Sequence, residues 1–236
     1  MTRKVVLINA NVLQPPVSPV GLEYVADAVI RAGIPLYVID LVFEKDWRLC
    51  LQKELKNTDI LFTGVSVRNT DDCSFISGKS FLPWINEVVT EVKKYTDAPV
   101  FLGGVGFSVM PDIVMQTTGS DGGIAGDGED AVVALAQSIL HKDNWESLPN
   151  VVFCRNGTIK CNPRKDVDLA LLPAPTRSVF DNRRYESQGA VVGIETKRGC
   201  GQECVYCADV IAKGSRVRLR SPEAVVKEFA NLVAQG

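Results

Sequence analysis

Three cysteines lie close together in the last part of the 236-residue chain, in the run Cys200-Gly-Gln-Glu-Cys204-Val-Tyr-Cys207. Three thiolates on one loop can hold three irons of a cubane cluster and leave the fourth iron open to an exogenous ligand. A zinc site would need a fourth ligand, and His141, the only histidine, lies far away in the sequence. Chance clustering of three cysteines is the other alternative. The spacing favours an iron–sulfur cluster with an open iron, which is a site for chemistry.

At these residues the chain resembles the radical SAM superfamily, whose signature is Cys-x-x-x-Cys-x-aromatic-Cys, with Tyr206 at the aromatic position. The resemblance implies that Cys200, Cys204 and Cys207 bind a 4Fe-4S cluster whose open iron takes the amino and carboxylate groups of S-adenosylmethionine. It also implies that Tyr206 lies near the adenine, and that reductive cleavage of the sulfonium yields a 5'-deoxyadenosyl radical. Residues 218–223 are similar to the segment that opens the next helix in many members.

Basic residues are in local excess around the cysteine loop, with six of them against two acidic ones between Lys197 and Arg220. Such an excess could receive the carboxylate of S-adenosylmethionine, or an acidic electron donor such as a flavodoxin or ferredoxin. The alternative is an ordinary solvated surface.

The residues before this loop alternate between short strands and amphipathic helices. Apolar runs that end in glycine or polar turn residues predict parallel strands over 4–9, 36–40, 60–65, 100–103 and 122–125. Apolar side chains repeat with helical spacing at Leu22, Val25, Ala26 and Val29, at Ile85, Val88, Val89 and Val92, and at Val132, Leu135, Ala136 and Ile139. This alternation predicts an α/β fold, a doubly wound parallel sheet that binds ligands at the carboxyl ends of its strands.

A hairpin is predicted at the end of this sheet, because Asn156-Gly157 lies between two strand-like runs. The pairing places Cys154 opposite Ile159 and makes Cys161 only its diagonal neighbour, too far for an easy disulfide. Both cysteines are therefore predicted to be free thiols.

We predict three parts: a flavodoxin-like sheet with its hairpin over 1–162, a proline-containing linker over 163–189, and a second unit over 190–236. The second unit begins with a strand over 190–196 and ends in a helix that starts near Ser221. It corresponds to the first strand–helix pair of a truncated radical SAM partial TIM barrel. A lone pair cannot bury both faces of its strand, so we expect an N-terminal fragment that does not turn over by itself.

A sheet of this size is typical of dinucleotide-binding, receiver and cobalamin-binding domains. No Gly-x-Gly-x-x-Gly follows the first strand and no P-loop is present, which argues against a dinucleotide or a nucleoside triphosphate. Asp40 ends the second strand without the acidic cluster of a phosphorylatable receiver. Residues 14–16, 19–26, 39–40, 101–104 and 126–129 instead resemble the cobalamin-binding domain that precedes many radical SAM barrels.

Glycines carry part of this second resemblance, which implies that Gly103, Gly104, Gly126 and Gly128 let the backbone approach a bulky nucleotide tail. The alternatives from the residues alone are a tight turn at Gly103-Gly104 and a helix cap at Asp127.

The histidine that ligates cobalt in classical cobalamin domains is absent after the first strand. The resemblance implies that cobalamin binds without a histidine below the cobalt, and that the loop containing Ser66, Arg68 and Asn69 faces the lower side of the corrin. Arg68 is the candidate beneath the cobalt, because a guanidinium stays protonated and cannot ligate a metal. The alternative is a surface ion pair of Arg68 with Asp71 or Asp72.

The composition is ordinary, with 46% hydrophobic and 23% charged residues, a net charge of -2 and a pI near 5.6. This charge gives no field that favours nucleic acid or an anionic membrane. No apolar run is long enough for a bilayer span or a secretory signal. We therefore expect a cytoplasmic protein with reduced thiols and with neither nucleic acid nor a membrane as its partner.

Together these features predict a cobalamin-dependent radical SAM enzyme, a methyltransferase that acts at an unactivated carbon with methylcobalamin and the 5'-deoxyadenosyl radical. One alternative is a relative that uses the same cofactors for cyclisation or rearrangement. Another is a corrinoid-type domain that serves as a scaffold without cobalamin. The sequence does not identify the substrate, which we expect to be a small molecule or a peptide.

Overall fold

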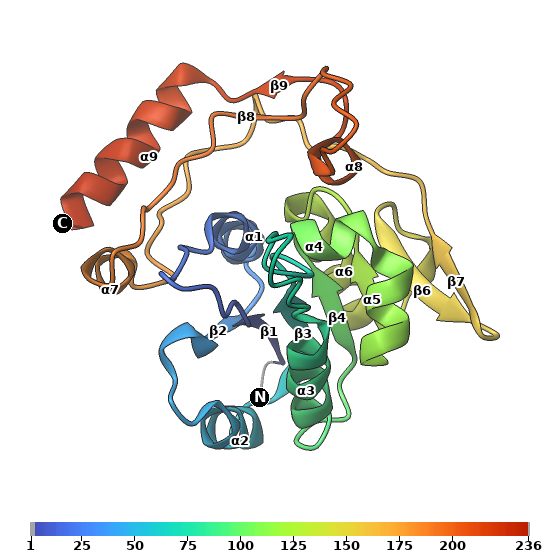
Figure 1. Ribbon diagram of the computed structural model, residues 1–236. Helices are drawn as coiled ribbons and strands as arrows, with labels where there is room; N and C mark the ends of the chain where they lie inside the picture. The colour runs from blue at the N-terminus through green and yellow to red at the C-terminus, as the bar shows by residue number, and fades with distance from the viewer. Residues whose placement is uncertain (1–2, 236) are drawn as a thin grey trace.

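The computed structural model describes residues 3–235, and a seven-stranded sheet forms its centre (Figure 1). The strand order is β2-β1-β3-β4-β5-β6-β7, in which β1 to β5 are parallel and β6 and β7 are antiparallel. The first five strands follow the order 2-1-3-4-5 of flavodoxin-like sheets. The predicted α/β fold with a mostly parallel sheet is confirmed.

The sheet strands are β1 (Lys4–Asn9), β2 (Leu36–Asp40), β3 (Ile60–Ser66), β4 (Val100–Gly103), β5 (Gly122–Ile124), β6 (Val151–Arg155) and β7 (Thr158–Cys161). The helices of the same region are α1 (Val20–Arg31), α2 (Trp47–Lys56), α3 (Leu82–Val92), α4 (Val105–Val109), α5 (Pro111–Thr118) and α6 (Glu129–His141). Two short 3-10 helices, Leu41–Phe43 and Trp145–Ser147, lie in its loops. We call residues 3–162 the sheet domain.

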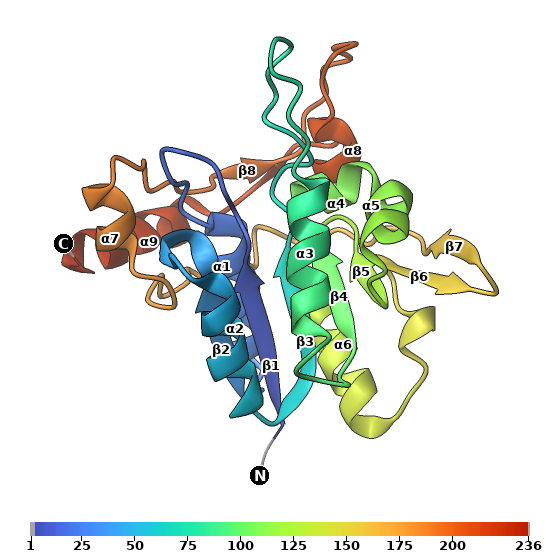
Figure 2. The same cartoon turned by 60° about the horizontal axis from the view of Figure 1, so that its bottom comes forward.

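Helices cover both faces of the sheet, with α1 and α6 on one face and α2, α3 and α5 on the other (Figures 1 and 2). The pleat of β1 sends Val5 and Leu7 to the first face and Val6 and Ile8 to the second. Each face thus has its own apolar core.

The predicted helical stripes are confirmed in α1, α3 and α6. The stripe of α3 is buried along its whole length, from Ile85 to Val92. In α1, Val29 is buried in the core, whereas Leu22 and Val25 lie nearer the carboxyl ends of the strands. The sequence did not predict the short helices α4 and α5, because they have too few turns for a periodic stripe.

The hairpin is confirmed with its register. Cys154 lies opposite Ile159, and Cys161 lies opposite Val152. Both cysteines are free thiols, as predicted.

Residues 163–235, which we call the C-terminal segment, form an arc over the carboxyl ends of the strands (Figure 1). Its elements are α7 (Asn182–Ser187), β8 (Lys197–Arg198), α8 (Asp209–Lys213), β9 (Arg218–Leu219) and α9 (Pro222–Gln235). The stretch over 163–189 contains α7, which the sequence did not predict, and buries Val167, Leu169 and Leu172 in a small cluster of their own.

The predicted strand over 190–196 is wrong. The two residues of β8 follow it and pair antiparallel with β9, and no described strand lies beside 190–196. In its middle, backbone groups bond to side chains instead: the carbonyl of Gly193 accepts from Arg177, and the amide of Glu195 donates to the Tyr24 hydroxyl. The apolar run has strand composition, but a strand also needs a neighbour for its backbone groups.

The predicted final helix is confirmed as α9. Its first turn contains Pro222, and the Ser221 hydroxyl accepts a hydrogen bond from the amide of Ala224 at 3.1 Å. Within residues 3–235, none of the helices is long and apolar enough to cross a membrane.

Candidate cofactor-binding site

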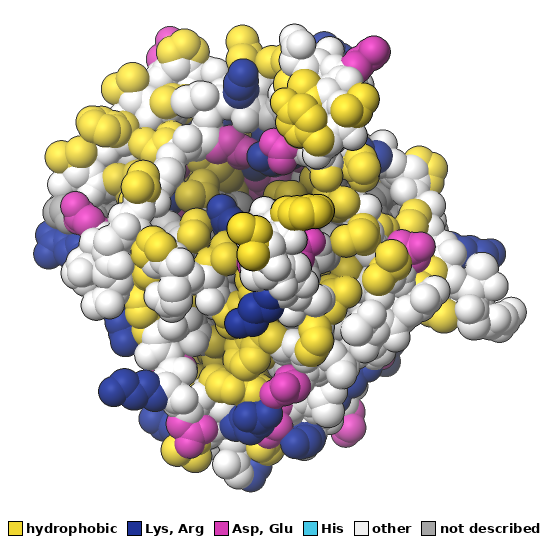
Figure 3. Space-filling model, viewed as in Figure 1, with side chains coloured by type: hydrophobic (Ala, Val, Ile, Leu, Met, Phe, Trp, Pro, Cys, Tyr) yellow, Lys and Arg dark blue, Asp and Glu magenta, His cyan; other side chains and the backbone are white. Residues whose placement is uncertain are grey.

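The carboxyl ends of β1, β3, β4 and β5 open onto a cavity of about 1240 Å³. Residues 191–198 and α8 form its opposite wall, so the cavity lies between the sheet domain and the C-terminal segment, where Figure 3 shows the surface hollowed. All the residues predicted to contact cobalamin or the adenine of S-adenosylmethionine line this cavity: Ser66, Arg68, Asn69, Gly103, Gly104, Gly126, Gly128 and Tyr206. The parallel topology brings those of the sheet domain together because its strand ends meet at one edge, and Tyr206 comes from the cysteine loop on the opposite wall.

Two glycines hold the β4–α4 turn against the loop that follows β3. Gly104 has a φ of +98°, and a Cβ there would lie 2.6 Å from the carbonyl oxygen of Val67. The amide of Gly106 donates to the carbonyl oxygens of Val67 and Arg68, each at 3.0 Å. A close approach within the chain therefore accounts for Gly104, and it fixes the backbone of Arg68 at the cavity wall.

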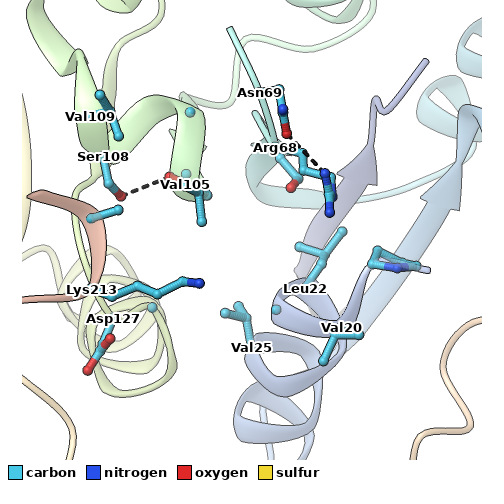
Figure 4. Close-up of a pocket in the computed structure, with 18 of the residues that line it drawn as sticks. Val20, Leu22, Val25, Arg68, Asn69, Val105, Ser108, Val109, Asp127 and Lys213 are labelled. Atoms are coloured by element: carbon cyan, nitrogen blue, oxygen red, sulfur yellow. Dashed lines mark hydrogen bonds between the residues drawn. The ribbon is translucent and has the colours of Figure 1, made fainter. Parts of the chain in front are cut away.

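The Arg68 guanidinium reaches the cavity without an acidic partner. Its Nη1 donates to Oδ1 of Asn69 at 3.0 Å (Figure 4). Asp71 and Asp72 accept from their own loop instead, from the Cys73 amide at 2.7 Å and the Ser77 hydroxyl at 2.6 Å. The alternative pairing of Arg68 with either carboxylate is not found in the described part of the chain.

Ser108 on α4 joins the two glycine turns of the cavity. Its hydroxyl donates to the carbonyl oxygen of Gly104 at 2.8 Å and accepts from the amide of Gly126 at 2.9 Å. The sequence did not single out Ser108, because a serine four residues after a turn glycine carries no signature of its own.

Asp127 lies between the glycines of the second turn and is 5% exposed. Its carboxylate pairs with Arg218, with Arg198 at 3.3 Å and with Arg164 at 3.7 Å, and it accepts from the Val167 amide at 3.0 Å. Burial acts to raise the pKa of Asp127, but the hydrogen bond from Arg218 and the charge of Arg198 outweigh it, so the pKa lies below its usual value. The interpretation of Asp127 as a helix cap is wrong. The N-cap position of α6 is occupied by Gly128, and no side chain caps this helix.

The arginines around the cysteine loop are mostly internal. Arg198 is 7% exposed and donates to Glu129 at 3.0 Å and to Glu195 at 2.7 Å. Arg220 pairs with the buried Glu228. Only part of the basic excess is therefore a solvated surface, and these arginines attach the loop region to the sheet domain.

A second buried network lies between α1, α7 and α9. Arg177 is fully enclosed, with its Nε 2.5 Å from Glu23 and its Nη1 2.6 Å from Glu228. The Tyr24 hydroxyl donates to Glu228 at 2.9 Å and accepts from Arg220 at 3.0 Å. Two arginines and two glutamates thus balance their charges inside the protein.

Asp40 is part of an anchor for α7. Its carboxylate accepts from Asn9 at 3.0 Å and from the Tyr185 hydroxyl at 2.7 Å, and burial raises its pKa. These bonds occupy the carboxylate, which fits the absence of a receiver signature in the sequence.

The cysteine loop carries three free thiols, of which Cys200 is half-buried and Cys204 and Cys207 are exposed. Cys207 and its neighbour Tyr206 lie at the cavity wall. Among residues 3–235, no three Cys, His, Asp or Glu side chains are gathered around one metal position. The thiols fit an open-iron cluster by number and type, and the assignment of Cys200, Cys204 and Cys207 as metal ligands stays a prediction.

The chain matches no protein-family model. It is 30% identical over its whole length to tryptophan 2-C-methyltransferase of Streptomyces laurentii, of which it covers 48%. It is 23% identical to hopanoid C-3 methylase of Methylococcus capsulatus, over 92% of the chain and 41% of that protein. The structure of the radical SAM methyltransferase TsrM from Kitasatospora setae, with cobalamin and a [4Fe-4S] cluster bound, matches the whole chain with a TM-score of 0.93 and 31% identity.

The chain belongs to the cobalamin-dependent radical SAM family. It spans about half the length of the relatives it matches, including 48% of TsrM. The cobalamin-dependent radical SAM enzyme OxsB has the same fold over the whole chain, with a TM-score of 0.79 at 16% identity. The family resemblance seen in the sequence is confirmed.

Proposed function

We propose that this chain forms the corrinoid-binding part and the cluster-binding loop of a cobalamin-dependent radical SAM methyltransferase acting at an unactivated carbon. One observation supports this most: the strand ends of the sheet domain and the cysteine loop, through Tyr206 and Cys207, line the same cavity. Two cofactors held by these two elements would face one another. The names of the relatives, a tryptophan 2-C-methyltransferase and a hopanoid C-3 methylase, describe methylation at carbon.

The cysteine loop would hold the iron–sulfur cofactor. When bound, a 4Fe-4S cluster with S-adenosylmethionine would supply the 5'-deoxyadenosyl radical, and cobalamin would supply the methyl group. The thiolates of Cys200, Cys204 and Cys207 would bind the cluster. Tyr206, which is exposed at the cavity wall, would lie near the adenine.

The loop after β3 would lie under the corrin, with Ser66, Arg68 and Asn69 at its face. The Arg68 guanidinium can donate hydrogen bonds but has no lone pair for a metal, so this face would offer no nitrogen ligand to cobalt. The exposed guanidinium and its missing acidic partner support this role.

A small-molecule or peptide substrate would enter the same cavity. A flavodoxin or ferredoxin would deliver electrons near the basic side chains that stay exposed, such as Lys197 and Arg216. The internal arginines of the loop region would take no part in that contact.

Cluster binding is tested by anaerobic reconstitution of the chain. We expect about four irons per chain, and their loss when Cys200, Cys204 and Cys207 are replaced together by alanine. The matched control replaces Cys154 and Cys161, two exposed thiols outside the signature, and should keep the iron. Stoichiometric zinc without iron uptake would refute cluster binding.

Corrinoid binding is tested by electron paramagnetic resonance of added cob(II)alamin. We expect a bound species without nitrogen superhyperfine splitting from an axial base, and an Arg68→His variant that gains this splitting. Splitting in the unmodified protein would refute the unligated lower face. No corrinoid uptake at all would favour the scaffold alternative.

A further inference from the structure

Four cationic side chains line the cavity: Arg68, Lys197, Arg198 and Lys213. They differ in the hydrogen-bond and ion-pair partners that the protein supplies. Arg198 is enclosed by carboxylates, and Arg68 donates to its neighbour Asn69. Among residues 3–235, the Lys213 ammonium has one ion pair, with the carboxylate of Asp209 at 3.4 Å, and the Asp209 side chain is itself 53% exposed. A solvated pair of this kind contributes little, so Lys213 keeps most of its capacity for a ligand.

Lys213 extends into the cavity. In Figure 4 its amine points away from Asp127 of the β5–α6 turn and toward Val25 of α1. Val20, Leu22 and Val105 make the neighbouring walls apolar. A charge is less well hydrated in such a place than at an open surface, which strengthens its attraction for an anion.

The backbone under Lys213 is held in place. Arg164 donates to the carbonyl oxygen of Ala212 at 2.7 Å, and Arg218 donates to that of Lys213 at 2.9 Å. Both arginines also pair with the buried Asp127. These bonds hold the last turn of α8 beside the Gly126–Gly128 turn, so that the backbone of Lys213 has a defined position and the ammonium lies within reach of that turn.

The chemistry of a complete corrinoid matches this position. Its peripheral side chains are neutral amides, and its nucleotide tail contains one anionic phosphodiester. A lysine ammonium is a compact charge with three donors and no acceptor, which suits phosphate oxygens. Its one carboxylate partner, Asp209, is solvated, and Asp127 and Glu129, which also line the cavity, are already paired with arginines.

We propose that Lys213 binds the phosphodiester of a corrinoid's nucleotide tail and thereby places the tail beside the Gly126–Gly128 turn. This inference rests on the proposed corrinoid-binding function. It assigns to α8, the helix that follows the cysteine loop, a direct contact with the corrinoid.

Three corrinoids separate the phosphate from the rest of the ligand: hydroxocobalamin, cobinamide phosphate and cobinamide, which lacks the phosphate. Their dissociation constants are measured by absorbance titration of the 236-residue chain. We expect Lys213→Met to weaken hydroxocobalamin and cobinamide phosphate by about 10-fold or more, and cobinamide by less than about twofold. Lys213→Arg should recover most of the affinity, because it keeps the charge and the donors.

Two further variants test whether weaker corrinoid binding is specific to the loss of Lys213. Lys160→Met removes an exposed lysine on the hairpin and should bind all three corrinoids as the unmodified chain does. Lys197→Met removes another lysine that lines the cavity. An equal loss in Lys197→Met would show a general effect of positive charge and would overturn the proposal.

Other outcomes are equally decisive. Equal weakening of all three corrinoids by Lys213→Met would show a structural effect, and no weakening would show that Lys213 is not a ligand; both overturn the proposal. Weaker binding of S-adenosylmethionine alone, in the cluster-loaded chain, would assign the ammonium to its carboxylate and also overturn it. Failure of the unmodified chain to bind any corrinoid would instead refute the proposed function beneath it.

Discussion

The sheet domain and the C-terminal segment are stabilised by different interactions. Apolar side chains fill both faces of the sheet, in two separate cores. The C-terminal segment has a small apolar cluster of its own. It attaches to the sheet domain through three arginines that are at most 8% exposed, with Arg177 bound to Glu23, Arg198 to Glu129 and Arg220 to the Tyr24 hydroxyl. Apolar packing tolerates replacements of similar size, whereas a buried ion pair needs both partners. The wall of the cavity opposite the strands therefore depends on few and specific residues.

The largest difference between the two regions is expected for Arg177→Met, which leaves Glu23 buried without its arginine and removes one of the two arginines that pair with Glu228. We expect the attachment of α9 to lose about 3 to 5 kcal/mol. Amide hydrogen exchange should become faster in α9 and in 190–198, while the amides of β1 and β3 keep their protection.

The matched change in the sheet domain is Leu135→Ala, at a fully buried position of α6. We expect it to cost about 2 to 5 kcal/mol and to speed exchange throughout the sheet. If Arg177→Met speeds exchange in β1 and β3 equally, the two regions unfold as one unit and the comparison fails.

Asp127→Asn should have the next largest effect, about 3 kcal/mol at pH 7, because three arginines lose a buried partner. The pKa of Asp127 is lowered in the folded protein, so its stabilisation is complete above the pKa of an unfolded aspartate, about 3.9, and is lost as pH falls through the lower folded value. Urea unfolding of both proteins between pH 7 and pH 2.5 measures this. A difference in unfolding free energy that does not shrink below about pH 4 would contradict the ionised role.

The smallest effect is expected for Ser108→Ala, about 1 to 2 kcal/mol, because two hydrogen bonds between the glycine turns are lost. Ser138→Ala is the matched control, since the Ser138 hydroxyl is buried and has no hydrogen-bond partner in the described structure. Chemical denaturation compares the two. An equal loss of unfolding free energy in both variants would mean that the Ser108 hydroxyl contributes only its volume and not its hydrogen bonds.

The sheet domain could be predicted because its pattern is local. Strands and helices have different apolar periods, and Asn156-Gly157 sets the hairpin register from two residues. The same local pattern failed over 190–196, where strand composition is present but a neighbouring strand is not. The amino-acid composition of a segment shows which secondary structure it can adopt. Whether a strand forms also depends on a neighbouring strand that binds its backbone groups.

The candidate site was predicted in part for the same reason. Ligands bind at the carboxyl ends of parallel strands, and this rule correctly predicted that Ser66, Gly103 and Gly126 line one wall of the cavity. The ion pairs could not be predicted, because partners such as Glu129 and Arg198 lie 69 residues apart and either could be an ordinary surface charge. Asp127 was misinterpreted on these grounds, since an acid before a helix is more often a cap.

The bond between Tyr24 and Glu228 joins residues 204 positions apart and has a consequence for the order of folding. The strands of the sheet domain are complete once the hairpin has been synthesised, whereas the wall opposite them requires the chain to extend through α9. Domains form N-terminal first during synthesis, and contacts distant in sequence form late. The newly made protein therefore passes through a stage in which the strand ends are an open trough, and a cofactor as large as a corrinoid can settle there before the arc of the C-terminal segment closes above it.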